Sequence, residues 1–234
     1  MSEQAIQKQM NNEEIEEKPE EGGCAHVCEA DKHDDPIERL QKQILACRIC
    51  RERFGFEPRP VVFGHGDAPI VQIGQAPGSK VHQSGIPFTD QSGRTLREEW
   101  YHVDEGTFYD PDIFYMTMVG HCYPGKAKSG DKKPPKICWE KWTSHELENL
   151  EKMDSARLFL VIGREAAEHL FGKRRMDDLV FADLSLHGKP CFVLPHPSPL
   201  NRRWLKEHPD FEQVQLPKIR MAIEKVLAEK KKQE

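Results

Sequence analysis

The sequence predicts an α/β fold, with a central, mostly parallel β-sheet covered by helices on both faces. Short apolar runs suited to buried strands, such as residues 158–162, alternate along the chain with segments whose apolar residues recur at a helical period. Alternating strands and helices favour crossover connections, which make neighbouring strands parallel. The chain has 234 residues, enough for one sizeable domain and a tail.

Each expected element has its own pattern. Residues 37–50 should form a helix, because Ile37, Leu40 and Ile44 recur near a 3.6-residue period. Residues 68–73 are apolar enough for a buried strand. We expect further strands at 61–63, 113–119, 158–162 and 190–194, and further helices at 95–102, 139–150, 165–171 and 217–234.

Charge is unevenly distributed along the chain. The net charge is -5, but residues 1–36 contain eleven acidic residues and three lysines, a net of -8, so the remainder is +3. The first segment also lacks large apolar residues, which predicts a disordered acidic tail. We therefore expect a tail at 1–36, a domain at 37–216 and a C-terminal helix with a basic end at 217–234.

The location and the redox state follow from what the sequence lacks. There is no apolar run of membrane-spanning length and no signal-peptide core. We expect a soluble, cytoplasmic protein that is monomeric and does not bind membranes. The seven cysteines are then thiols or metal ligands rather than disulfides.

Four cysteines are candidate metal ligands. Cys47 and Cys50 form a CxxC at the end of a predicted helix, which directs two sulfurs the same way. Cys122 and Cys138 flank a later loop. Four thiolates suit zinc or an iron–sulfur cluster, and the spacing alone does not decide between them.

The other cysteines have simpler interpretations. Cys24 and Cys28 lie in the tail beside two histidines, and such a mixture is more often incidental than a metal site. Cys191 lies in a predicted strand and should be a small core residue.

The loop after residues 190–194 is the strongest candidate for a functional site. Three prolines fix its backbone and hold His196 and Ser198 in set directions. Arg202 and Arg203 follow and suit phosphate contacts, whereas Trp204 suits packing. A proline-rich turn that happens to contain a histidine is the simpler alternative.

Two other loops could support a site there. Residues 74–78, Gly-Gln-Ala-Pro-Gly, follow a strand and would let a ligand approach backbone N–H groups. Phe88 is either a core residue or a ring on which a base stacks. The loop 123–137 contains five lysines, which would attract phosphates if it lay beside a nucleic-acid site.

The order of these motifs resembles the iron–sulfur branch, family 4, of the uracil-DNA glycosylase superfamily. The order is CxxC, Gly-Gln-Ala-Pro-Gly, Gly-Ile-Pro-Phe, a strand ending in Cys, a Lys/Pro loop, a second Cys and His-Pro-Ser, over roughly residues 40–205. The resemblance implies a four-stranded parallel sheet in an α/β/α sandwich. It also implies a structural [4Fe–4S] cluster on Cys47, Cys50, Cys122 and Cys138, and DNA as the partner.

The resemblance also implies roles for individual residues. His196 would hydrogen-bond uracil O2, Phe88 would stack on the base, and the loop from Pro197 would press into the minor groove with Leu200 as a wedge. The implied base-contacting residues are Gly74, Ala76, Pro77, Gly78, Phe88, Met118 and Ser198. The implied DNA-contacting residues are Pro197, Leu200, Asn201, Arg202 and Arg203.

Three positions depart from the family pattern. Gln75, which with His196 is an implied catalytic residue, stands where the first motif usually has Glu, although Gln cannot act as a base. Ala76 stands where other branches have Asp or Asn. Met118 aligns with an Asn that reads the uracil edge, and Met cannot make that paired hydrogen bond. The resemblance thus favours a DNA glycosylase for uracil or another deaminated base such as hypoxanthine. A non-catalytic iron–sulfur DNA-binding protein and a cytoplasmic redox or metal protein are the alternatives.

Overall fold

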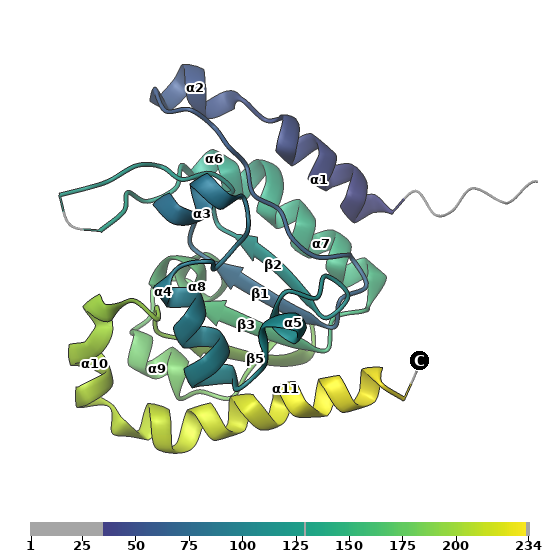
Figure 1. Ribbon diagram of the computed structural model, residues 1–234, viewed down its shortest axis with the longest axis vertical. Helices are drawn as coiled ribbons and strands as arrows, with labels where there is room; N and C mark the ends of the chain where they lie inside the picture. Colours follow the sequence, from purple (N-terminus) through teal and green to yellow (C-terminus); the bar gives the residue numbers. More distant parts are fainter. Residues whose placement is uncertain (1–34, 129, 233–234) are drawn as a thin grey trace, which may run out of the picture. The chain divides into compact units, whose positions relative to one another are not determined.

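A β-sheet forms the centre of the fold (Figure 1). The structure is a computed structural model that describes residues 35–128 and 130–232. Cys24, Cys28 and nearly all of the predicted acidic tail lie outside the described residues. Within them the strands are β1 (Ile70–Gly74), β2 (Phe114–Met118), β3 (Leu158–Ile162), β4 (Leu184–Leu186) and β5 (Lys189–Leu194).

The sheet confirms the predicted α/β class. In the described part of the chain its order is β2-β1-β3-β5-β4, and the first four strands are parallel. The fifth, β4, pairs antiparallel with β5 and was not predicted. The strand predicted at 61–63 is wrong, because only Phe63 forms a bridge there, with Met116.

Helices and single helical turns connect the strands. They are α1 (Pro36–Ala46), α2 (Ile49–Phe54), α3 (Ser79–Ser84), α4 (Gln91–Arg94), η2 (Thr95–Tyr101), α5 (Glu105–Phe108), α6 (Lys136–Cys138), η3 (Trp139–Thr143), α7 (Ser144–Met153), α8 (Gly163–Phe171), α9 (Met176–Val180), η4 (Pro199–Asn201), α10 (Arg202–Glu207), η5 (Phe211–Gln215) and α11 (Leu216–Lys230).

Side-chain contacts define the two helical layers. The Tyr101 hydroxyl of η2 donates to Gln72 Oε1 of β1 at 2.8 Å, whereas the Tyr115 hydroxyl of β2 donates to Glu146 Oε1 of α7 at 2.5 Å. Gln72 pairs in register with Met116, the neighbour of Tyr115, so these two side chains leave opposite faces. Therefore η2 and α7 cover opposite faces, and the predicted three-layer arrangement is confirmed.

The predicted helix at 37–50 is two helices. The Asp35 side chain accepts from the Ile37 N–H at 2.8 Å and begins α1, with Pro36 in its first turn. At Cys47 the backbone becomes extended, with ψ of 132°, and α2 begins two residues later. The CxxC therefore spans a helix break. Its two cysteines do not have the relative orientation of residues i and i+3 in one continuous helix.

The carboxyl ends of the parallel strands lie at one edge of the sheet. The arrowheads of β1, β2 and β3 point to the same side, toward α3 and α4 (Figure 1). Loops at this edge are the usual ligand site of an open parallel sheet.

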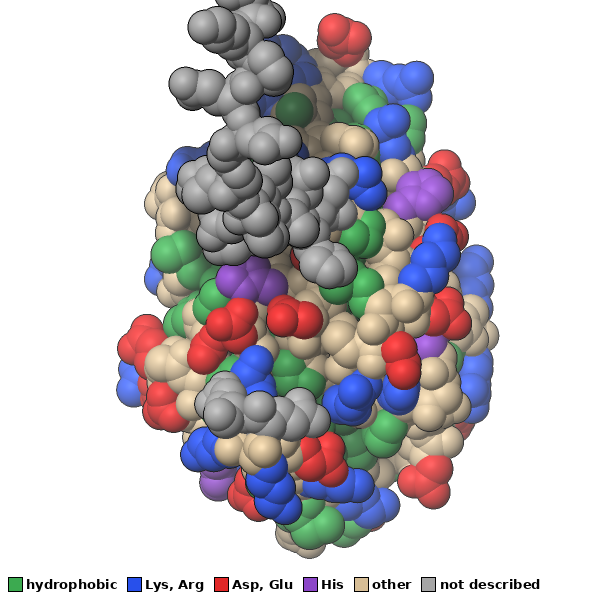
Figure 2. All heavy atoms as spheres, turned by 90° about the vertical axis from the view of Figure 1, so that its right-hand side faces the viewer, with side chains coloured by type: hydrophobic (Ala, Val, Ile, Leu, Met, Phe, Trp, Pro, Cys, Tyr) green, Lys and Arg blue, Asp and Glu red, His purple; other side chains and the backbone are tan. Residues whose placement is uncertain are grey.

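The opposite side of the molecule carries mixed charge. Figure 2 shows acidic and basic side chains interspersed on the face near α1 and α7. No helix in the described residues combines the length and apolar composition needed to cross a bilayer.

Candidate functional site

A cleft of about 440 Å³ opens at the carboxyl ends of the parallel strands. Its size lies within the range of small-molecule binding clefts. It brings together residues from four segments that the sequence analysis had singled out separately: Gly74, Gln75, Ala76, Pro77, Gly78, Phe88, Met118, His196, Ser198, Leu200 and Asn201. Pro197, Arg202 and Arg203 do not line this cleft.

His196 lies in the loop directly after β5, and its ring is largely enclosed. The Ser198 N–H lies 3.2 Å from Nδ1, so Nδ1 accepts and Nε2 carries the proton of the neutral ring. Burial lowers the pKa of His196, although the charges of Asp90 and Asp131 oppose that shift. The site therefore holds a neutral imidazole with an Nε2–H donor.

Gly163 lies directly beside His196. Gly163 has a φ of +83°, and a Cβ there would lie 3.4 Å from His196 Cβ. A side chain at 163 would be strained by this φ, and its Cβ would come into van der Waals contact with His196. Gly163 is the first residue of α8 and directly follows β3.

Hydrogen bonds within the proline-rich loop stabilise the rest of it. The Asn201 amide donates to the His196 carbonyl at 2.7 Å, and Ser198 Oγ accepts from the Leu200 N–H at 3.3 Å. These bonds leave the Leu200 side chain 76% exposed at the edge of the cleft. An apolar side chain held outward on a braced loop can contact a macromolecule.

Beyond this loop, α10 starts on the surface. Arg203 pairs with Glu207 within the helix, at 2.8 Å. The Trp204 indole N–H donates to Asp177 at 2.8 Å, and its ring stacks on His208 with centroids 4.2 Å apart. The prediction that Trp204 packs is confirmed.

Phe88 enters the cleft from a strained backbone. Its φ is +54°, an uncommon value for a bulky residue. The Tyr109 hydroxyl donates to the Phe88 carbonyl at 2.8 Å. A Cβ on Gly93 would lie only 1.7 Å from the same carbonyl oxygen, so only glycine fits there. The surroundings thus fix where the ring points.

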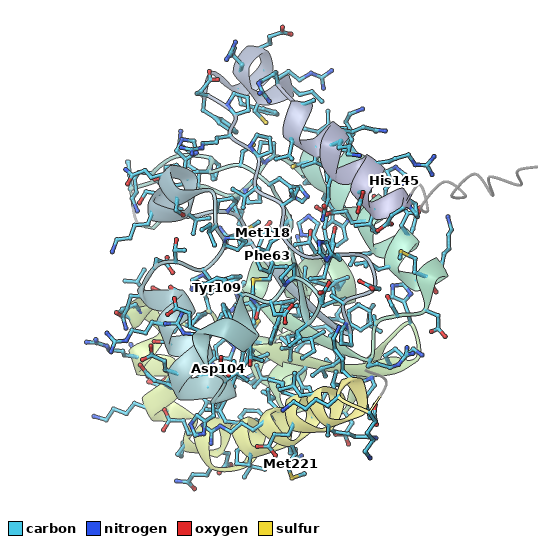
Figure 3. The ribbon with its side chains drawn as sticks, turned by 45° about the vertical axis from the view of Figure 1, so that its right-hand side comes forward. Phe63, Asp104, Tyr109, Met118, His145 and Met221 are labelled. Atoms are coloured by element: carbon cyan, nitrogen blue, oxygen red, sulfur yellow. The ribbon has the colours of Figure 1, made fainter. Side chains whose placement is uncertain are left out.

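The inner end of the cleft is apolar. A Cβ at Gly74 would lie 3.5 Å from both Met118 Cγ and Phe88 Cζ, so all three residues meet there. Met118 is 3% exposed and packs with Val61 and Val81. It lies inside the molecule, whereas His145 on α7 is exposed (Figure 3). Met118 has neither an amide nor a hydroxyl, so it does not replace the hydrogen-bonding group of the Asn in the family pattern.

Two carboxylates that the sequence analysis missed also line the cleft. A Cβ at Gly78 would lie 3.6 Å from Asp90 Oδ2 and 4.0 Å from Asp131 Oδ2. Asp90 Oδ1 accepts from the Gly93 N–H at 3.1 Å and caps α4. Asp131 pairs with Lys126 at 2.7 Å. Acidic oxygens thus face the 74–78 loop although the loop itself has none.

The four candidate cysteines lie close enough to affect one another. Burial, followed by repulsion from Cys138, Cys50 and Cys47, raises the pKa of Cys122 to about 12. Burial also raises the pKa of Cys138 to about 12, although a hydrogen bond from the His121 N–H to its sulfur, at 3.3 Å, opposes the shift. Thiolates gathered here need a bound cation to replace their protons.

The donor chemistry of these four residues suits two kinds of group. Four cysteine thiolates are the ligands of a [4Fe–4S] cluster and also of a structural, tetrahedral zinc ion. The residues present are therefore compatible with a [4Fe–4S] cluster.

A buried polar network connects the cysteine loop to the cleft. Glu146 Oε2 lies 2.9 Å from His121 Nε2 and accepts from the Thr117 hydroxyl at 2.7 Å. The Thr143 hydroxyl donates to the Met118 carbonyl at 2.7 Å and lies 3.3 Å from His121 Nε2. The end of β2 is thus held by the segment that contains the cysteines.

Comparisons with known proteins agree with this geometry. Residues 61–220 match the family model described as the uracil DNA glycosylase superfamily. A type-4 uracil-DNA glycosylase of Sulfurisphaera tokodaii is 22% identical over 140 residues, which are 59% of this chain and 60% of that protein. A type-4 uracil-DNA glycosylase of Archaeoglobus fulgidus is 26% identical over 154 residues, covering 64% of this chain and 70% of that protein.

Proposed function

Because the chain belongs to the uracil DNA glycosylase superfamily, we propose that it is a DNA glycosylase of base-excision repair. It flips a deaminated base, uracil first, out of DNA and hydrolyses the N-glycosidic bond. The observation that carries the proposal is the enclosed, neutral His196 with its Nε2–H available to the cleft.

His196 stabilises the departing base. When the glycosidic bond breaks, the sugar becomes cation-like and negative charge builds on the base oxygens. A donor that is already oriented, Nε2–H, meets that charge at uracil O2 without reorganisation. The lowered pKa keeps the ring neutral, so Nδ1 retains the Ser198 N–H bond that orients it.

The other walls bind the flipped base. The Phe88 ring stacks on one face, and the backbone of Gly74, Gln75 and Ala76 lies along the base edge, with Pro77, Gly78 and Ser198 completing the wall. Leu200 fills the space that the flipped base leaves, and the surrounding DNA contacts come from Pro197, Asn201, Arg202 and Arg203.

Asp90 supplies the acidic group that the first motif lacks. Gln75 cannot serve as a base and Ala76 has no polar atom, whereas Asp90 Oδ2 faces the same loop. A carboxylate there orients water for attack on C1′ and stabilises the cationic sugar.

An Asp90→Asn variant tests this assignment. Asparagine also caps helices well, so α4 and the melting temperature should change little. We expect kcat for base release to fall by about 100-fold while KM stays similar, measured by single-turnover kinetics. If Asp131→Asn produces the loss and Asp90→Asn does not, the water lies against Asp131 instead.

Met118 weakens selection for uracil. A Met118→Asn variant should raise the ratio of kcat/KM for uracil to that for hypoxanthine by about tenfold, because the amide can pair with the uracil edge. The buried amide lacks a hydrogen-bond partner in the free protein, so the free energy of unfolding should be lower by about 1–3 kcal/mol. Met118→Leu is the matched control, and an unchanged ratio in both variants would contradict the assignment.

Cys47, Cys50, Cys122 and Cys138 hold a [4Fe–4S] cluster in this proposal. The four thiolate donors support it, and Cys138, Cys50 and Cys47 lie close enough to Cys122 to raise its pKa. A cluster on these residues would tie the break between α1 and α2 to the loop that follows β2. Its contribution is therefore to hold the segments around Met118 in place.

The proposal is tested with labelled oligonucleotides that carry uracil, hypoxanthine, xanthine or a mismatched thymine. Abasic product from the uracil oligonucleotide supports the proposal. Faster release of one of the other bases would show the effect of Met118 on base selection. A second candidate, a non-catalytic iron–sulfur DNA-binding protein, is motivated by Gln75, Ala76 and Met118. DNA binding without product from any base would favour that candidate.

A further inference from the structure

A second cleft lies on the other side of His196. Its volume is about 420 Å³, and it shares Gln75, His196 and Asn201 with the cleft described above, here called the base cleft. Arg164 and Arg175 are among its other walls. The two clefts are therefore neighbours that share one wall, and a ligand too large for the base cleft can extend into the second.

The two clefts differ in charge. The base cleft is lined by two carboxylates, Asp90 and Asp131, and one ammonium, Lys126. The second cleft is lined by two guanidinium groups, of Arg164 and Arg175, and one carboxylate, Asp177. With His196 neutral, the first is net negative and the second net positive. A polyanionic strand is favoured in the second cleft and not in the first.

Both arginines can exchange their present partners for a phosphate. Arg175 pairs with Asp177 at 3.0 Å, but its side chain is 77% exposed. Asp177 also accepts from the Trp204 indole, so it keeps a partner when Arg175 moves. Arg164 lies 4.0 Å from Glu168 and is 63% exposed. Exposed pairs of this kind are weak, and guanidinium groups suit phosphate oxygens.

We infer that the second cleft binds the sugar–phosphate backbone of the nucleotide adjacent to the flipped one, with Arg164 and Arg175 on its phosphate. This inference rests on the proposed function, because a flipped base in the base cleft places its own strand at the shared wall. The strand continues from there, and the positive cleft is the adjoining surface that suits it. The shared wall includes His196, so a phosphate there also fixes the sugar beside the imidazole.

The test measures DNA binding rather than catalysis. The probe is a duplex with one 2′-fluoro-2′-deoxyuridine, which resists excision, and its affinity is measured by fluorescence anisotropy over a range of KCl concentrations. Arg175→Ala and Arg164→Ala should each weaken binding. The double variant should lower the slope of log K against log salt by about 0.9, the value for one phosphate contact on duplex DNA.

The control is Arg174→Ala, an exposed neighbour that does not line the second cleft. An equal loss of slope in this variant, or no loss in the double variant, would overturn the inference. Base release by the wild-type protein is measured separately. Excision with an unchanged slope refutes the second cleft alone, whereas an arginine-dependent slope without excision refutes the proposed function alone.

Discussion

Replacing His196 with alanine is expected to lower kcat for base release by about 100- to 1,000-fold, the usual effect of removing one donor to a developing oxyanion. The fold should be retained, because the bond from Asn201 to the backbone carbonyl of residue 196 survives the change. Single-turnover release of base at saturating protein measures the loss directly.

Two further variants separate the hydrogen bond from general damage. His196→Gln keeps a donor near the position of Nε2 and should recover part of the lost rate. His145→Ala removes an exposed histidine on α7 (Figure 3) and should leave the rate unchanged. Equal rates for the Gln and Ala variants would show that the Nε2–H does not carry the effect.

The histidine also gives stability a pH dependence of defined sign. Its folded pKa lies below the unfolded value of about 6.5, so the unfolded chain binds more protons in the window just below that pH. The free energy of unfolding therefore falls as pH falls through this window. Urea denaturation at several pH values should show a smaller fall for His196→Gln.

Replacing Cys138 with alanine is expected to remove most of the bound iron and its visible absorption. It should also lower the melting temperature on the order of 10 °C. Loss of a metal site typically costs on the order of 4–5 kcal/mol, and 1 kcal/mol corresponds to about 2–4 °C at this chain length. Iron content, absorption spectra and calorimetry measure the three effects.

Cys191→Ala is the matched control for that variant. Cys191 is 3% exposed in β5, and burial raises its pKa to about 12, as expected for a core thiol. Its loss should cost only about 1 kcal/mol and leave the iron unchanged. A colourless wild-type protein that contains zinc would instead contradict the cluster, whatever the variants show.

Local sequence patterns predicted the parallel strands because each is a short, mostly apolar run. They did not predict β4, whose three residues Leu184–Leu186 are too few for a pattern. The helix break at Cys47 was also missed, because Ile37, Leu40 and Ile44 keep a helical period that simply stops before it. The helical period of the apolar residues does not indicate at which residue the helix ends.

The site could be predicted only in part for a related reason. His196 and Phe88 stand in short motifs, so the sequence identified them. Asp90 and Asp131 reach the 74–78 loop through the positive φ of Phe88 and the Lys126–Asp131 bridge, and neither follows from spacing. The second cleft likewise depends on how α8 and α9 meet the loop after β5.

The most direct test of the central claim is the release of free base, detected by mass spectrometry, from duplex DNA with one uracil. We predict that the wild-type protein releases uracil, leaves an abasic site, and loses this activity in the His196→Ala variant. Tight DNA binding by an intact, iron-containing protein that releases no uracil, hypoxanthine, xanthine or mismatched thymine would contradict the account.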